Sequence, residues 1–160
     1  MAKTFKIYSP IDEAFSVRRI VGSGAAATIG QGTPTKQGSA GAVAIMADGE
    51  GTTSELFTGM AKTVSTDTAA AAGEVYTYLP LPGIIYSGSP KVAGAANTQA
   101  EIDALVGTRT VFDLTSTDWT IDAAASDAIG NAVVIVGGDY LSDTLYFCVT
   151  HTMLNFFENN

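Results

Sequence analysis

The sequence predicts a mainly β protein, a compact β-barrel or β-sandwich with one short α-helix at about residues 99–106 and an extended N-terminal arm. Two observations lead to this fold class. Short runs rich in β-branched and aromatic residues recur, and Gly, Pro, Asp and Ser separate them roughly every 8–12 residues. Only one segment has the spacing of an amphipathic helix, whereas βαβ folds alternate strands with helices of about 10–15 residues. We therefore expect strands joined by turns.

The N-terminal quarter of the chain differs in composition from the rest. Thr4–Tyr8 and Ser16–Val21 contain the β-branched and aromatic residues of short strands. The segment Gly22–Gly41 has six glycines, a composition typical of a linker or a long loop. The sequence therefore predicts an N-terminal arm and Gly-rich tether at residues 1–41, followed by a β-rich body at residues 42–160.

The body contains a series of short β-type runs bounded by turn residues. These runs are Ala42–Ala47, Ser54–Phe57, Met60–Val64, Val75–Leu79, Ile84–Tyr86, Thr110–Thr115, Asp118–Asp122, Asn131–Val136 and Asp143–His151. We expect the last two runs to form a hairpin that turns at Gly137-Gly138-Asp139, because paired glycines beside an aspartate are typical of a turn.

The predicted helix begins with a recognisable cap. Thr98–Glu101 is a capping box, in which the Thr hydroxyl and the Glu carboxylate satisfy free backbone N–H groups at the start of a helix. Ile102, Leu105 and Val106 form an apolar stripe, and Gly107 is a common C-terminal stop. This segment is the one credible helix in the sequence.

Composition and charge argue against several classes of protein. Hydrophobic residues make up 46% of the chain, but 24 residues are Ala, and no apolar run approaches the roughly 18 residues of a membrane span. The single cysteine forms no internal disulfide. The net charge of −8 divides into +3 over residues 1–36 and −11 over residues 37–160. The acidic body argues against nucleic acid and membranes as partners. The basic stretch is either an arm that docks on an acidic surface or a chance placement of solvated charges.

One motif matches the pattern of a nucleotide-binding loop. Gly22–Ala27 satisfies G-x-G-x-x-A after a predicted strand, and a later strand ends in Asp48. A dinucleotide site needs a helix directly after this loop, because N–H groups at the helix start hold the pyrophosphate. Gly30, Gly32 and Pro34 interrupt any helix there. We therefore expect a flexible loop and no cofactor, and a nucleotide-binding enzyme is only the minor alternative.

Cys148 and His151 suggest a nucleophile with its base. They lie three residues apart in a predicted strand, and because side chains alternate along a strand, they point to opposite faces. Each is the only residue of its type, so a single chain assembles neither a Cys/His zinc site nor a His-based triad. A structural cysteine and a histidine at a strand end are the favoured interpretation.

Pairs of acidic residues are the remaining candidates for chemistry. Two carboxylates suit glycoside hydrolysis, and acidic loops suit Ca²⁺. The pairs are Asp48/Glu50, Asp118/Asp122 and Asp139/Asp143, all beside turn residues and none at the spacing of a calcium loop. The sequence therefore predicts solvated turn residues, with neither catalytic nor metal-ligating side chains.

Three parts of the body share a characteristic order of residues. They are Phe57–Ala61, Val64–Thr68 and Ala72–Val75; then Thr98–Gly107, Val111–Thr115 and Trp119–Asp122; and finally Val134–Asp139 and Thr144–Phe147. In these segments the chain resembles the small head-decoration, or cement, proteins of tailed phages. Residues 1–41 do not share this resemblance.

The resemblance implies a structural virion protein that is made in the host cytoplasm and is not an enzyme. It implies a β-rich homotrimer on the outer capsid surface, at three-fold or quasi-three-fold positions, that stabilises the shell against internal DNA pressure. Such proteins often use an N-terminal arm that adds a strand to the capsid. Carried over to this sequence, the residues of the arm that would contact the major capsid protein are Lys3, Phe5, Lys6, Ile7, Tyr8, Phe15, Arg18 and Arg19. A tail or fibre component is the alternative within the virion.

Overall fold

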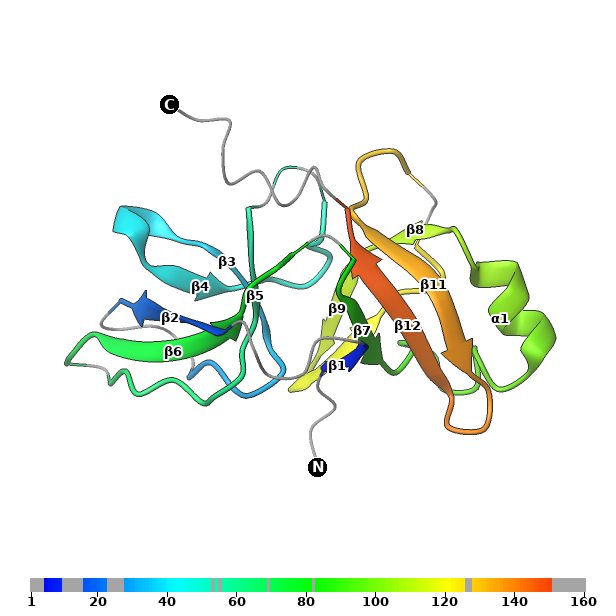
Figure 1. The fold of residues 1–160 in the computed structure, drawn as a ribbon, viewed down its shortest axis with the longest axis horizontal. Helices are drawn as coiled ribbons and strands as arrows, with labels where there is room; N and C mark the ends of the chain where they lie inside the picture. Colours follow the sequence, from blue (N-terminus) through cyan, green and yellow to red (C-terminus); the bar gives the residue numbers. More distant parts are fainter. Residues whose placement is uncertain are drawn as a thin grey trace.

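A computed structural model shows a mainly β molecule with one α-helix in the part of the chain that it describes (Figure 1). The described residues are 5–9, 16–22, 28–52, 54, 56–68, 70–81, 83–125 and 128–150. Two five-stranded sheets and a two-stranded hairpin account for the strands. The predicted fold class is confirmed, and the arrangement is closer to packed sheets than to a closed barrel.

The first sheet is antiparallel throughout and has the order β1-β7-β12-β11-β8. Its strands are β1 (Lys6–Ser9), β7 (Ile85–Gly88), β12 (Thr144–Val149), β11 (Val133–Asp139) and β8 (Arg109–Thr110). Tyr86, Phe147 and Ile135 lie directly opposite one another on its inner face, and all three are buried. Along β12, buried and half-buried residues alternate, as the sequence predicted.

The helix α1 (Gln99–Leu105) packs against β11 at one end of the molecule (Figure 1). Its predicted capping box is present: the backbone N–H of Glu101 donates to the Thr98 hydroxyl, and the backbone N–H of Thr98 donates to the Glu101 carboxylate. Ile102 is the buried residue of the helix and lies against Gly138. The prediction for residues 99–106 is therefore confirmed to within one residue.

The second sheet has the order β5-β3-β4-β2-β6, with one parallel contact between β2 and β4. Its strands are β5 (Phe57–Met60), β3 (Pro34–Gln37), β4 (Val43–Ile45), β2 (Ser16–Val21) and β6 (Gly73–Tyr78), and a short 3-10 turn η1 (Ser39–Gly41) precedes β4. The sheet curls, so that Ala61 pairs with Thr77 and the N–H of Lys62 donates to the carbonyl of Tyr76 at 2.7 Å. A small apolar cluster lies inside it: Val21, Ile29, Val43, Ala61 and Val75.

A shared core connects the two sheets. The hairpin of β9 (Phe112–Thr115) and β10 (Asp118–Ile121) contributes Phe112 to this core, and the second sheet contributes Phe57 and Met60. The two sheets therefore share this hydrophobic core.

Gly59 allows β5 to lie against β6 within the second sheet, because a Cβ there would be 2.0 Å from the carbonyl oxygen of Tyr78 and φ is 123°.

The structure corrects the predicted arm and tether. β1 pairs with β7, β2 pairs with β6 along its whole length, and β3 is paired on both sides although it lies in the Gly-rich stretch. In the described residues, then, position 41 is no boundary between an arm and a body. The Gly-rich composition gave a wrong prediction for β3, because backbone hydrogen bonds to two neighbouring strands hold it and these bonds do not depend on the type of side chain. Its Thr35 is buried and donates a side-chain hydrogen bond to the carbonyl of Gly59 at 2.7 Å.

Two turns also differ from the prediction. The sequence predicts separate strands at 54–57 and 60–64, whereas the structure has the single strand β5 at Phe57–Met60. Gly137, Gly138 and Asp139 continue β11 instead of forming the turn, because a bulge after Ile135 shifts the register. The turn of the β11–β12 hairpin follows at residues 140–143.

Candidate functional site

The turn between β11 and β12 presents apolar side chains to solvent. Leu141 is 83% exposed, and Tyr140 beside it is also exposed. The carboxylate of Asp139 accepts a hydrogen bond from the backbone N–H of Leu141 at 3.0 Å and one from the Ser142 hydroxyl at 2.7 Å. These bonds hold the turn in one conformation, which is typical of an Asx turn. We call residues 139–143 the Leu141 turn.

Asp143 fixes the base of the Leu141 turn. Its carboxylate accepts hydrogen bonds from the backbone N–H groups of Gly94 at 2.6 Å and Ala96 at 2.9 Å, so the hairpin is tied to the loop before α1. Asp143 itself has φ 47°, a left-handed conformation that aspartate tolerates better than most residues. The Leu141 turn therefore presents its apolar residues from a rigid base, as a docking element does.

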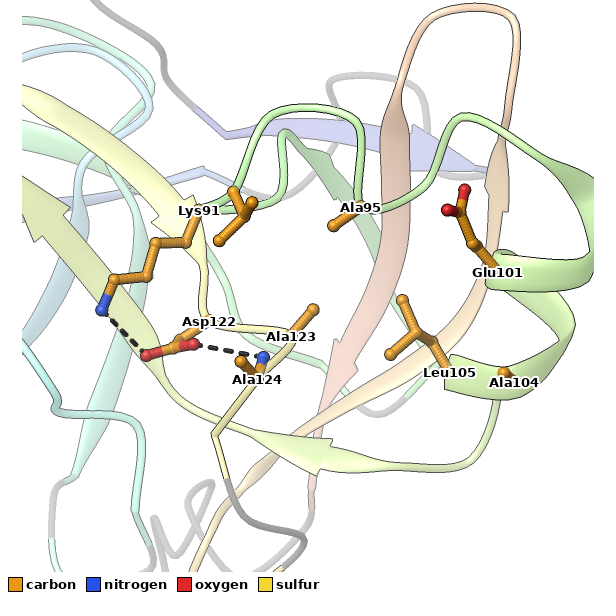
Figure 2. Close-up of a pocket in the computed structure, with 9 residues that line it drawn as sticks. Lys91, Ala95, Glu101, Ala104, Leu105, Asp122, Ala123 and Ala124 are labelled. Carbon is orange, nitrogen blue, oxygen red and sulfur yellow. Dashed lines mark hydrogen bonds and ion pairs between the residues drawn. The ribbon is translucent and has the colours of Figure 1, made fainter.

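A shallow hollow lies between α1, the loop before α1 and the segment after β10 (Figure 2). Its volume is about 260 Å³, below the roughly 300–1,000 Å³ of most small-molecule sites. Ala95, Leu105 and Ala123 are among its apolar lining residues, and Figure 2 shows Lys91 and Glu101 on opposite sides of it. The Glu101 carboxylate is occupied by the helix cap, and Lys91 and Asp122 form an ion pair with each other, so the lining offers no free converging set of polar groups.

Lys91 joins two carboxylates beside this hollow. Its Nζ lies 2.7 Å from Oδ1 of Asp113 and 3.0 Å from Oδ2 of Asp122. Asp113 is buried and also accepts hydrogen bonds from the hydroxyls of Thr115 at 2.9 Å and Thr120 at 3.0 Å. Burial alone raises the pKa of Asp113, but the hydrogen bonds from Lys91 and the two threonines outweigh it and bring the pKa below its usual value. Hydrogen bonds to the same carboxylates raise the pKa of Lys91.

The ion pairs of Lys91 with Asp113 and Asp122 have a structural role. A general acid needs a carboxyl group whose pKa is raised toward neutrality, and the pKa of Asp113 moves the other way. Asp122 pairs with Lys91, and its side chain also accepts from the backbone N–H of Ala124 at 3.2 Å. The arrangement joins the loop before α1 to the β9–β10 hairpin.

The other acidic pairs hold loops in a similar way. Asp48 accepts from the backbone N–H of Leu114 at 3.0 Å, and Glu50 accepts from the backbone N–H of Ala47 at 2.6 Å and forms an ion pair with Lys36. Among the residues that the structure describes, no group of three or more His, Cys, Asp or Glu side chains could hold a metal ion.

The remaining predicted motifs lie partly outside the described residues. Of Gly22–Ala27 only Gly22 is described, and His151 also lies outside. Cys148 is half-buried on the outer face of β12, and burial raises the pKa of its thiol. A raised pKa disfavours the thiolate that a nucleophilic cysteine needs.

The structure distributes the predicted capsid-binding residues over different surfaces. Phe5 is buried, with its ring 5.0 Å from that of Phe147 and 5.3 Å from that of Phe112, so it is a core residue and not a contact residue. Lys6 is exposed on β1, whereas Arg18 is exposed on β2 in the other sheet and forms an ion pair with Glu74. The other predicted residues are Arg19, which is half-buried, Ile7 and Tyr8, whose side chains are not described, and Lys3 and Phe15, which lie outside the described residues.

Sequence reasoning missed the Leu141 turn. The signal in the sequence was a Tyr-Leu pair between Asp139 and Ser142, that is, two large apolar residues among turn-forming ones. These residues fell between the predicted turn at Gly137-Gly138-Asp139 and the predicted strand Asp143–His151, and they were assigned no role. Only the register of the hairpin places Leu141 at the tip.

Comparison of the chain with protein-family models, with characterised proteins and with solved structures finds no match. Of the described residues, none belongs to a helix long and apolar enough to cross a membrane. The candidate functional site is therefore defined by its own geometry, as the rigid apolar Leu141 turn.

Proposed function

We propose that this chain is a structural virion protein that binds the outside of a viral capsid. It acts as a homotrimer at three-fold or quasi-three-fold positions and stabilises the shell against internal DNA pressure by binding, without catalysis. The resemblance of Phe57–Ala61, Thr98–Gly107 and Val134–Asp139 to phage head-decoration proteins supports this proposal.

The observation that carries the proposal is the placement of exposed apolar side chains on rigid elements in separate regions. Leu141 and Tyr140 lie at the tip of one hairpin, and Ile20 and Tyr76 lie on adjacent strands at the other end of the molecule (Figure 1). A protein that only pairs with itself about a two-fold axis needs one such surface, whereas a ring of three copies uses two different patches on each copy. A decoration protein needs at least two, since it contacts both its own copies and the shell.

The Leu141 turn suits the contact with the shell. Its conformation is set before binding by Asp139 and Asp143, so little conformational entropy is lost when it docks. Burying a Leu side chain contributes about 1.5–3 kcal/mol. Because the protein binds the assembled shell and not its separated subunits, each bound copy stabilises the assembled state by mass action.

Shells that lack the protein provide the test. The purified chain is mixed with such shells, and binding is measured by co-sedimentation and by electron microscopy of the particles. The expected result is density at three-fold positions and a higher temperature of genome release. Absence of binding together with unchanged heat resistance contradicts the proposal, and density on the tail assigns the chain to the tail or fibre instead.

A further inference from the structure

The outer face of β2 and β6 carries an unusual set of side chains. The register places Arg18 opposite Tyr76, and Ile20 opposite Glu74, with all four side chains on the same face. Ile20 is 49% exposed and Tyr76 is 43% exposed, although both lie in the interior of paired strands. A pair of strands with large exposed apolar residues at its centre is typical of an interaction surface.

These four residues form the corners of a rectangular array. Adjacent strands are about 4.8 Å apart and alternate residues of one strand about 6.7 Å apart. Arg18 and Glu74 occupy one diagonal and form an ion pair, and both side chains remain largely accessible to solvent. Ile20 and Tyr76 occupy the other diagonal.

We propose that this β2–β6 face binds the same face of a second copy of the chain, about a two-fold axis that runs along the Ile20–Tyr76 diagonal. Rotation about this axis places Ile20 on its counterpart and Tyr76 on its counterpart. The same rotation brings each of the other two corners near its opposite, so Arg18 of each copy lies close to Glu74 of the other. Such a contact is isologous, because each copy offers the same patch.

The sheet geometry agrees with this axis. A two-fold axis along the diagonal of this rectangular array makes the strands of the two copies cross at a steep angle, and near-orthogonal crossing is one of the two common ways in which sheets pack. Each Arg18 then has a carboxylate in its own copy and another in the partner, and the two pairs form a four-charge network. Networks of this kind contribute more than isolated surface ion pairs do.

The charges of the face favour a second copy over other occupants. The four corners carry one cation and one anion, and one further cation, Lys62, lies beside them with its Nζ 5.7 Å from the centre of the Tyr78 ring. Nucleic acid and anionic lipid surfaces are bound by clusters of several cations. A copy of the same face presents the opposite charge at both charged corners, and an apolar residue at both apolar corners. The proposal is independent of capsid binding, since a two-fold contact joins one copy of the chain to another whether or not either is bound to a shell.

Two charge reversals test the contact. Arg18→Glu gives a face with two anions, and Glu74→Arg gives a face with two cations, so each variant repels its own copies. The mass of the assembly in solution, measured by light scattering at several concentrations, is expected to fall to half that of the wild type in each variant. An equimolar mixture of the two is expected to recover the full mass, because the anionic face attracts the cationic one.

Asp103→Arg is the matched control, because it makes the same change in net charge as Glu74→Arg but lies on α1 at the other end of the molecule (Figure 1). It is expected to keep the wild-type mass. Equal masses for the wild type and both single variants overturn the proposal, as does a mixture that stays at half mass. Binding of each variant to shells is measured separately, so failure of the capsid proposal is distinguished from failure of this one.

Discussion

The Nζ atom of Lys91 lies 2.7 Å from Oδ1 of the buried Asp113. This ion pair joins the loop before α1 to the β9–β10 hairpin, and it holds a charged carboxylate in a buried position. The hydroxyls of Thr115 and Thr120 complete the hydrogen bonds of that carboxylate. The free energy of unfolding therefore depends on pH through this ion pair, because the contact requires the charged form of Asp113.

The first prediction concerns acid stability. Burial alone raises the pKa of Asp113, but Lys91 and the two threonines lower it overall, so the folded-state pKa lies below the unfolded value of about 3.9. A lowered folded-state pKa contributes stability at pH above about 3.9 that is lost as the pH falls through the folded-state value. In Asp113→Asn this contribution is missing. Urea unfolding is expected to show that the difference in the free energy of unfolding between wild type and variant narrows below about pH 4. A difference that is the same at every pH contradicts a stabilising role for the charged form of Asp113.

The second prediction concerns the N-terminal strands. Phe5→Ala is expected to lower the free energy of unfolding by about 3–5 kcal/mol, because the ring is buried against Phe112 and Phe147. Lys6→Ala, one residue further and exposed, is expected to change it by less than about 0.5 kcal/mol. Chemical denaturation measures both. Deletion of residues 1–21 is expected to unfold the protein, and a folded truncated chain is the contrary result.

The third prediction concerns the base of the Leu141 turn. Asp143→Ala removes the acceptor for the N–H groups of Gly94 and Ala96, and the expected destabilisation is about 1–3 kcal/mol. Asp143→Asn keeps one acceptor oxygen and tolerates the positive φ, so it is expected to cost less. Amide hydrogen exchange at Gly94 and Ala96 measures the effect directly. Unchanged exchange in Asp143→Ala shows that the carboxylate does not hold the loop.

The fourth prediction concerns binding to the shell. Leu141→Ser is expected to weaken binding about 10- to 100-fold, the equivalent of the roughly 1.5–3 kcal/mol that burial of a Leu side chain contributes. Its melting temperature is expected to stay at the wild-type value, because the side chain is 83% exposed. Ile129→Ser is the matched control, since that side chain is 86% exposed on another loop. Equal loss of binding in both variants contradicts a specific role for Leu141.

The elements that the sequence predicted correctly depend on local interactions. The capping box of α1 lies within Thr98–Glu101, so its hydrogen bonds form between neighbours in the chain. The alternation of buried and half-buried residues along β12 follows from the geometry of a single strand. Such features need no knowledge of the partner strand.

The errors occurred where a distant partner decides the structure. β3 lies in a stretch that has the composition of a linker, yet β4 and β5 hold it by backbone hydrogen bonds that leave little trace in composition. Phe5 was predicted to contact a partner, whereas it is buried against the rings of Phe112 on β9 and Phe147 on β12. The turn residues Gly137 and Gly138 became strand residues because a bulge shifted the register.

The sequence by itself determined the mainly β class, the one helix with its cap and the divided charge, because propensity, capping and composition act over a few residues. The tertiary structure alone decided that the N-terminal strands belong to the sheets, that Leu141 lies at a rigid tip, and that Arg18, Ile20, Glu74 and Tyr76 form one face. Each of these depends on pairing between segments far apart in the chain, and register across strands is set by the whole core and not by any one strand.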